Sequence, residues 1–252
     1  MARPASTKRP PPRPAGEPAR PRAAAASSSS DLLLATAERL YAERGLDGVS
    51  MREIAREAEQ KNNSALHYHF GSKEALLDAI IRLRMREVDA LRNAFLDACE
   101  EKGLDDLRTA VEALVRPLAH GLLAGRPDNY YNRFLAAAQI HPDIDLAAHA
   151  SEESQRGFRR VYARLERALP RLPSAVLSQR YLTGIALVTF SLADFERIRA
   201  RKARERGGFD MQRAVENLID MIAGALAAPV SEPVRSRLDG SHTPTRLDRR
   251  AS

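Results

Sequence analysis

Residues 50–76 read SMREIAREAEQKNNSALHYHFGSKEAL and contain two short helix signals separated by a polar break. Ser50 is followed three positions later by Glu53, which is the arrangement of a capping box. In a capping box each of the two side chains accepts a hydrogen bond from the backbone N–H of the other residue. A helix is therefore predicted to begin at Met51, with its small apolar side chains on one face: Ile54, Ala55 and Ala58.

The polar break is followed by a second short helix, which is predicted to begin within residues 62–64, to continue to Phe70 and to end at Gly71. Asn and Ser favour caps and turns because their side chains compete for nearby backbone groups. Two short helices joined by a tight turn are typical of a helix-turn-helix, whose second helix enters the major groove of DNA. Asn can bind adenine through two hydrogen bonds, and Ser or His can donate to bases or phosphates. The candidate DNA-binding residues are Ser50, Arg52, Lys61, Asn62, Asn63, Ser64, Ala65, His67, Tyr68, His69 and Lys73.

The net charge of +7 is concentrated at the two ends of the chain. Residues 1–30 contain six Lys or Arg against one acidic residue, and residues 231–252 contain five Arg against three acidic residues. The remainder holds equal numbers of basic and acidic side chains. A neutral body with a basic arm suits a protein that meets phosphates over a limited patch, because counterion release then supplies affinity that does not depend on sequence. The arm is either a solvated tail or a segment that follows DNA beside the helix-turn-helix.

Length and composition restrict the class of protein. A chain of 252 residues with 44% hydrophobic residues can bury a sizeable core. No window approaches the roughly 18 uncharged apolar residues of a membrane helix, and residues 1–30 lack the apolar centre of a secretory signal. We therefore expect a cytoplasmic protein with no membrane partner. The single cysteine, Cys99, excludes an intramolecular disulfide and is expected to be a buried, small apolar residue.

No catalytic motif is evident in the sequence. It contains neither a glycine-rich phosphate loop nor a nucleophile elbow. Asp143 and Asp145 are explained more simply as helix caps than as a catalytic pair. His67 and His69 lie two positions apart on a predicted helix and point in different directions, so they do not easily share a metal ion. We expect no enzymatic activity, no metal and no cofactor.

The chain divides into four parts. Residues 1–30 are mostly Pro, Arg, Ala and Ser and are predicted to be a disordered basic arm. Residues 31–76 are predicted to form the helix-turn-helix domain, a three-helix headpiece whose first helix ends at Gly45. Because this domain is small, we expect it to be stabilised by packing against the helices C-terminal to it. Residues 77–228 form a helical domain, and residues 229–252 a disordered tail.

Long helices with few interruptions follow Lys73, and no strand-like alternation is present, so the predicted fold class is all-α. Pro117 is predicted to bend a helix rather than to end it. The predicted helices are one from Lys73 to about residue 100 and five more, at residues 104–123, 130–138, 151–169, 174–205 and 211–228.

The helix predicted at residues 174–205 has two apolar stripes. A helix that is apolar on more than one face must be covered by its own domain and by something else. Together with the helix at residues 211–228 it could pair with its copies in a four-helix bundle with twofold symmetry; alternatively both stripes are core of a single chain. The second stripe is Leu182, Ala186, Thr189, Phe190 and Ala193. The candidate dimer-interface residues are Leu177, Tyr181, Gly184, Val188, Leu192, Met211, Val215, Leu218 and Ile222.

Three segments, LLATAERLYAERG (33–45), VSMREIAREA (49–58) and YHFGSKEAL (68–76), resemble the N-terminal domain of the TetR family of bacterial transcriptional regulators. The resemblance implies a homodimeric, all-helical repressor of a palindromic operator in double-stranded DNA. It also implies that residues 77–228 bind a small effector and dimerise. The chain departs from the family at Glu59, where glycine is usual, and in a longer turn. The sequence leaves open which of Asn62, Asn63, Ser64 or His67 touches a base.

The resemblance further implies an effector pocket among the middle helices. Pockets of this kind combine large apolar walls with a few polar groups, although each candidate taken alone is more simply explained as part of the core. The effector is expected to be apolar. It would favour a conformation of residues 77–228 in which the long helix that begins at Lys73 moves the two headpieces of the dimer away from the spacing of the operator half-sites. Two alternatives remain: an all-helical enzyme with a helix-turn-helix-like N-terminus, and a DNA-associated structural protein without effector. The candidate lining residues are Phe95, Leu118, Phe134, Gln139, Phe158, Thr183 and Phe190.

Overall fold

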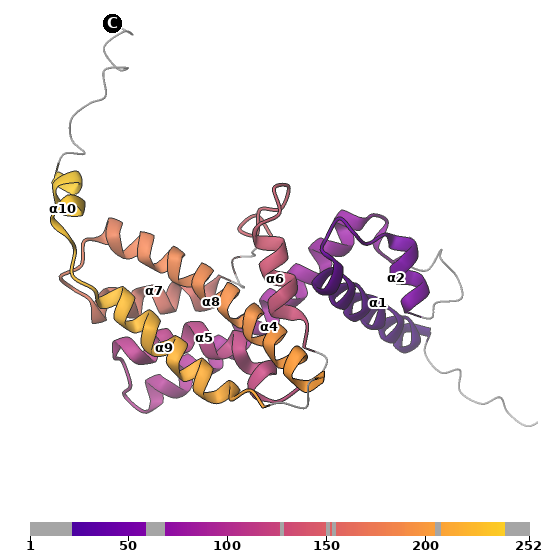
Figure 1. Cartoon of the computed structure of the whole chain (residues 1–252), viewed down its shortest axis with the longest axis horizontal. Helices are drawn as coiled ribbons and strands as arrows, with labels where there is room; N and C mark the ends of the chain where they lie inside the picture. The colour runs from indigo at the N-terminus through magenta and orange to yellow at the C-terminus, as the bar shows by residue number, and fades with distance from the viewer. Residues whose placement is uncertain are drawn as a thin grey trace, which may run out of the picture.

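The computed structural model describes residues 22–58, 69–126, 129–149, 152, 155–204 and 208–239, and within these ranges the regular secondary structure is entirely helical. The all-α prediction is confirmed, and most predicted helix bounds agree with the observed ones to within a few residues. Figure 1 shows a headpiece at one end and a longer helical body at the other. The helices are α1 (Arg22–Arg44), α2 (Met51–Glu57), α4 (Lys73–Glu101), α5 (Leu107–Leu123), α6 (Tyr131–Gln139), α7 (Arg156–Ala168), α8 (Ser174–Arg204), α9 (Met211–Ala227) and α10 (Glu232–Asp239).

Two segments that were predicted to be disordered are helical in part. Helix α1 begins at Arg22, so residues 22–30 belong to it rather than to the arm. The Ala residues at 23–26 have the highest helix propensity and extend the amphipathic helix backward. Helix α10 occupies Glu232–Asp239, because Pro233 is tolerated in a first turn. The remaining parts of the predicted arm and tail, residues 1–21 and 240–252, lie outside the described residues.

The headpiece is organised around the capping box at Ser50. The Ser50 Oγ accepts from the backbone N–H of Glu53 at 3.3 Å, and the Ser50 N–H donates to Glu53 Oε2 at 2.9 Å. Gly45 ends α1 with a φ of 80°, the left-handed conformation predicted there. Helix α1 packs against both α2 and α4 and buries Leu40 and Tyr41. Local capping therefore sets the angle between α1 and α2.

The short helix α6 connects the headpiece to the body. It packs against α1 on one side and α8 on the other, and Figure 1 shows it between the two parts. Tyr130 gives α6 no side-chain cap. Instead, the buried Glu196 of α8 accepts from the backbone N–H of Asn132 at 3.2 Å and from Arg133 Nε at 2.9 Å. A carboxylate at a helix N-terminus is favourable, so α8 holds α6 in place.

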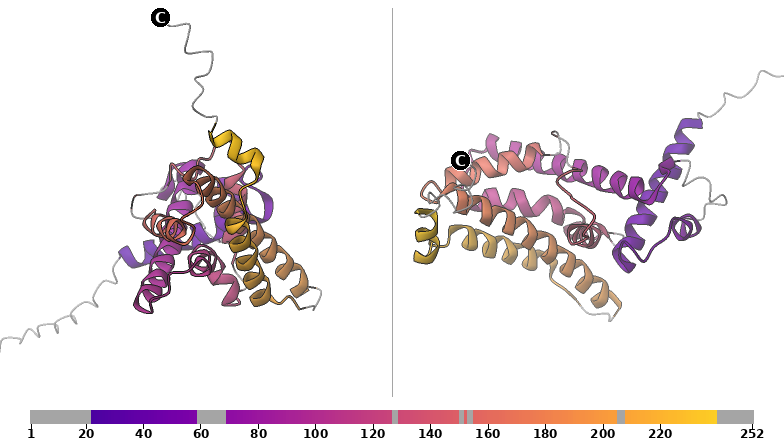
Figure 2. Two further views of the ribbon diagram at one scale, coloured as in Figure 1. Left: turned by 90° about the vertical axis from the view of Figure 1, so that its left-hand side faces the viewer. Right: turned by 90° about the horizontal axis from the view of Figure 1, so that it is seen from above.

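In the body, α5 contacts α4, α7, α8 and α9 and supplies more buried hydrophobic residues than any other described helix. Cys99 is buried and unpaired, as expected. Figure 2 shows α8 and α9 side by side along one flank, with α10 at the end farthest from the headpiece. Within the described ranges, this layout leaves the outer sides of α8 and α9 without cover from other helices.

Helix α8 corrects one expectation from the sequence. By length and composition, residues 174–202 could cross a membrane, whereas no such window was expected. Only 39% of that apolar window is buried inside the chain. The reason is the double stripe. One set of apolar side chains enters the core, and of the second stripe Leu182 and Phe190 stay exposed, whereas Thr189 and Ala193 are buried. Core helices of soluble proteins meet the same criterion.

Candidate functional site

The predicted DNA-facing residues that the structure describes lie around the starts of α2 and α4. Ser50 caps α2, and Arg52 is exposed in its first turn. Ser72 caps α4, and its Oγ accepts from the backbone N–H of Ala75 at 3.2 Å. Lys73 is the first residue of α4, and its Nζ lies 5.9 Å from the centroid of the Tyr41 ring. The backbone N–H groups of such a helix start, together with Lys73, can bind a phosphate.

Most of the predicted recognition helix lies outside the described residues. Of its residues, the structure describes His69 and Phe70, which are both half-buried and whose rings lie 6.2 Å apart. The other predicted contacts lie outside the described residues: Lys61, Asn62, Asn63, Ser64, Ala65, His67 and Tyr68.

An ion pair across helices α1 and α4 joins the headpiece to the body. The Nε and Nη2 of Arg84 donate to the two carboxylate oxygens of Glu38, at 2.6 and 3.1 Å. The Arg84 guanidinium also lies 5.9 Å from the centroid of the Tyr131 ring on α6. Although burial opposes it, the bonding to Glu38 holds the pKa of Arg84 above its ordinary value. We call the contacts among Glu38, Arg84 and Tyr131 the joint. The joint was not predicted from the sequence, and the available signal was Glu38, an acidic residue one position after Ala37 on the buried side of α1.

Three further contacts connect the body to the headpiece and α4. The rings of Tyr41 and Phe134 lie 6.3 Å apart, so α1 and α6 share an apolar contact. In the segment after α6, His141 Nε2 lies 3.2 Å from Asp47 Oδ1, in the turn between α1 and α2. His149 Nδ1 lies 2.6 Å from Asp78 Oδ1 on α4. A change in body shape near α6 would therefore reach the headpiece directly.

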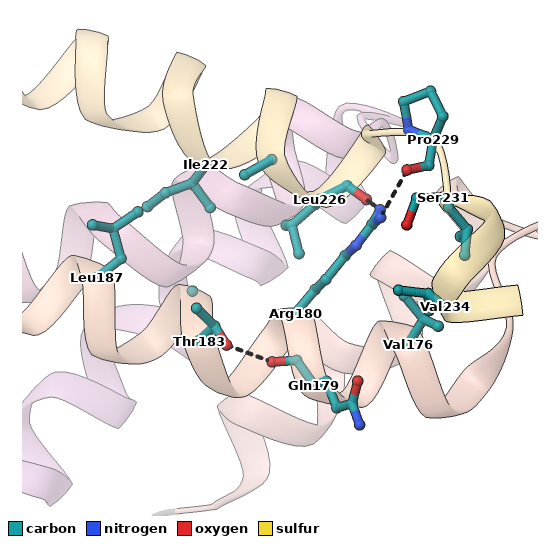
Figure 3. Close-up of a pocket in the computed structure, with 13 residues that line it drawn as sticks. Val176, Gln179, Arg180, Thr183, Leu187, Ile222, Leu226, Pro229, Ser231 and Val234 are labelled. Atoms are coloured by element: carbon teal, nitrogen blue, oxygen red, sulfur yellow. Dashed lines mark hydrogen bonds between the residues drawn. The ribbon is translucent and has the colours of Figure 1, made fainter. Parts of the chain in front are cut away.

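A cavity of about 360 Å³ lies between α8, α9 and α10. Figure 3 shows Arg180 reaching across it toward the end of α9. Its guanidinium donates to the backbone carbonyls of Leu226 at 2.7 Å and Ala228 at 2.6 Å. This cation caps the C-terminus of α9, which carries the negative end of the helix dipole. The Arg180 guanidinium in this cavity therefore already has hydrogen-bond acceptors within the chain, and these bonds connect α8 to the end of α9.

The predicted effector-lining residues do not converge on one cavity in the described part of the chain. Thr183 lines the cavity beside α10, and Phe158 lines a separate groove of about 320 Å³ between α7 and α8. Phe134 and Leu118 are buried in the core, and the former contacts the headpiece. The remaining three are half-buried or exposed: Phe95, Gln139 and Phe190. In the described ranges no group of three or more His, Cys, Asp or Glu side chains is arranged to hold a metal ion.

The predicted dimer-interface residues face the core of the chain itself, which corrects the choice of stripe. Nearly all of Leu177, Tyr181, Val188, Leu192, Val215, Leu218 and Ile222 is buried, Gly184 is also buried, and Met211 packs against the core from its edge. The large apolar side chains left exposed on α8 and α9 belong to other faces of these helices: Leu182, Leu187, Phe190 and Met221. Periodicity located two stripes but could not decide which one faces α5.

Comparison with known proteins gives two family matches. The family described as bacterial regulatory proteins, tetR family, matches residues 33–80, and the family described as tetracyclin repressor-like, C-terminal domain, matches residues 112–225. No curated protein matches the chain.

Several solved structures are similar. The TetR-family regulator PfmR from Thermus thermophilus shares 20% identity, with 76% of this chain and 96% of that chain covered and a TM-score of 0.49. FadR from Bacillus subtilis, solved with stearoyl-CoA, shares 13% identity, with 77% and 98% covered and a TM-score of 0.49. A TetR-family regulator from Pectobacterium atrosepticum shares 23% identity, with 84% and 100% covered and a TM-score of 0.38.

Proposed function

Because the chain belongs to the TetR family of bacterial transcriptional regulators, we propose that it is a homodimeric repressor that a small effector releases from a palindromic operator. As a member of this family it is a DNA-binding regulator and not an enzyme. The site of action is the cytoplasm, where bacterial DNA is accessible. The observation that carries the proposal is the joint between Glu38, Arg84 and Tyr131, which links the DNA-binding headpiece to the body.

Dimerisation is supported by the uncovered face of α8 and α9. Leu182 is 66% exposed, Phe190 42% and Met221 55%. Contiguous exposed apolar side chains mark interaction surfaces, and two copies of a helix pair can close into a four-helix bundle. A twofold dimer would hold two headpieces about one DNA turn apart, as a palindrome requires. The partner proposed for this face is therefore a second copy of the chain.

Effector response would proceed by a population shift. A ligand that binds one body shape better than the other shifts the equilibrium toward it, and the coupling equals the difference in binding free energy. Helix α4 runs from the headpiece into the body, and α6 touches both. A displacement of either helix would change the separation of the two headpieces. The effector's apolar part would occupy a pocket among the body helices.

A gel-shift experiment with the DNA upstream of the chain's own gene tests this function. A repressor should bind one palindromic segment at least about 10³-fold more tightly than random DNA, with an affinity that falls as salt rises. Light scattering should give twice the chain mass. Binding that is indifferent to sequence would favour the alternative, a DNA-associated structural protein without effector, and would contradict the proposal.

A further inference from the structure

Arg92 is the largest side chain that is fully buried in the described part of the protein. It lies on α4 and is 1% exposed. Its Nε donates to the backbone carbonyl of Ala113 at 3.2 Å. Its Nη2 is buried and, within the described residues, has no hydrogen-bond partner. A buried guanidinium N–H without an acceptor costs about 1–3 kcal/mol or more, so this donor is an unused binding group.

The acidic neighbour of Arg92 does not satisfy it. Asp89 Oδ1 lies 3.6 Å from Arg92 Nη1, beyond hydrogen-bond distance. That oxygen accepts instead from the backbone N–H of Gly157 at 3.0 Å, and Oδ2 accepts from Asn93 Nδ2 at 2.7 Å. Part of the Asp89 charge is therefore offset by donors other than Arg92. Burial lowers the pKa of Arg92 and raises that of Asp89, as expected for a pair that is only loosely matched.

The Arg92 guanidinium is covered by an aromatic ring. The Phe158 ring on α7 covers it, with the guanidinium carbon 4.0 Å from the ring centroid. Phe158 and Tyr181 also line the groove of about 320 Å³ between α7 and α8. The Tyr181 hydroxyl donates to the Phe158 carbonyl at 3.1 Å, and Tyr162 packs edge-on against Tyr181 at 5.3 Å. The Phe158 ring is thus part of the wall of an open aromatic groove and covers the guanidinium of Arg92, whose Nη2 has no acceptor among the described residues.

We propose that this groove is the entrance of the effector site and that the effector is an organic carboxylate, whose anionic group binds Arg92 once the Phe158 ring has moved aside. The inference rests on the proposed effector response and specifies the ligand class. Arginine presents a planar fork of N–H donors that matches a carboxylate. The apolar part of the ligand would contact Phe158, Tyr162 and Tyr181, because small-molecule sites combine apolar walls with a few polar anchors.

The position of Arg92 connects this site to the headpiece. Burial raises the pKa of the Tyr131 phenol at the start of α6, and the charge of Arg92 opposes that rise. The Arg84 guanidinium lies 5.9 Å from the centroid of the same ring and binds Glu38 on α1. A carboxylate that engages Arg92 would change the electrostatic environment of Tyr131. The ligand would thereby affect the contacts of Arg84 with Tyr131 and Glu38, which hold the headpiece against the body.

The test compares matched acids and amides by calorimetry with the full chain. The probes are 4-ethylbenzoate against 4-ethylbenzamide, and octanoate against octanamide. In at least one pair the acid should bind at least about tenfold more tightly than the amide. Arg92→Met should reduce that ratio to about one. Asp89→Asn, which keeps the cation, and Arg159→Met, which removes an exposed cation at the groove, should both preserve it.

Three results would overturn the proposal: neither acid is preferred over its amide, the preference survives in Arg92→Met, or Arg159→Met abolishes it. If Arg92→Met does not fold, Phe158→Leu decides. A smaller cover over the guanidinium should raise the ratio of acid to amide affinity several-fold, whereas the lost apolar contact weakens both ligands alike, and an unchanged or lower ratio contradicts the proposal. Palindrome binding by the ligand-free chain tests the proposed function separately. A protein that binds its operator but does not distinguish acid from amide would refute only this inference.

Discussion

The carboxylate of Glu38 on α1 lies 2.6 Å from the Nε of Arg84 on α4, and only 4% of the Glu38 side chain is exposed. Forty-six positions of sequence separate the two residues. Their contact crosses from the first helix of the headpiece to the helix that enters the body. Because the carboxylate is buried, it depends on Arg84 for most of its compensation, which makes the pair a sensitive point of the fold.

Arg84→Met should destabilise the protein by about 1–3 kcal/mol, because it leaves the buried Glu38 carboxylate without its cation. Adding Glu38→Gln to this variant should restore part of the loss, since a neutral amide costs less to bury than an unpaired charge. Urea unfolding measures both variants. The matched control is Arg82→Met, which breaks an exposed pair with Asp78 one turn away and should change stability by less than about 0.5 kcal/mol. Equal effects of Arg82→Met and Arg84→Met would show that the joint has no special role.

Residues such as these mark the boundary of what sequence can predict. The capping box of Ser50 and Glu53 and the end of α1 at Gly45 were predictable because each depends on neighbours within a few positions. The pairing of Glu38 with Arg84 was not, because it depends on the packing of α1 against α4. The face of α8 that turns inward likewise depends on where α5 and α9 lie. Arg92 carried a signal that went unused: it occupies the apolar face of α4 with Val88 and Leu96.

Two headpiece variants should separate base reading from phosphate contact. Lys73→Ala should weaken binding to the operator and to random DNA by the same factor and should reduce the salt slope by about 1, as loss of one phosphate contact does. Asn63→Ala should cost about 1–3 kcal/mol on the operator and much less on random DNA. Fluorescence anisotropy at several salt concentrations measures both effects, with Lys102→Ala, at the far end of α4, as control. If both variants lose affinity only for the operator, Lys73 has been given the wrong role.

Phe190→Asp should convert the dimer into a monomer, because it places a charge in the middle of the exposed apolar face of α8. Sedimentation should show half the wild-type mass at micromolar concentration, and palindrome binding should weaken with it. Ile140→Asp is the matched control, since Ile140 is also an exposed apolar residue but lies at the end of α6. A Phe190→Asp protein that remains a dimer would place the interface elsewhere.

Stability should depend on pH through Glu196. Burial raises the pKa of this carboxyl above its ordinary value of 4.5, although Arg133 and the backbone N–H of Asn132 oppose the rise. Between 4.5 and the higher value of the folded state, the folded chain binds more protons than the unfolded one. The contribution of Glu196 to the free energy of unfolding is therefore fully present below pH 4.5 and is lost as the pH rises through the folded-state pKa.

Glu196→Gln removes this titration. The free energy of unfolding of the wild type minus that of Glu196→Gln should fall as pH rises above 4.5 and then become constant. Urea unfolding of both proteins at half-unit steps from pH 4 to 7 measures the difference, in which other titrating groups largely cancel. A difference that increases with pH would mean that Arg133 outweighs burial and that the pKa of Glu196 is lowered.

Gly157→Ala should destabilise the protein by about 1–3 kcal/mol, because the chain has no room for a side chain there. A Cβ at this position would lie 2.5 Å from Asp89 Oδ1 and 2.9 Å from Arg92 Cδ, and both side chains are buried and have little freedom to withdraw. Gly224→Ala in α9 is the matched control, since its Cβ would meet no atom within 4 Å and alanine should stabilise the helix by about 0.5–1 kcal/mol. Urea unfolding of both variants gives the comparison. A Gly157→Ala protein as stable as the wild type would mean that Asp89 and Arg92 can move together away from α7. The close approach of α7 would then not be what fixes the guanidinium beneath Phe158.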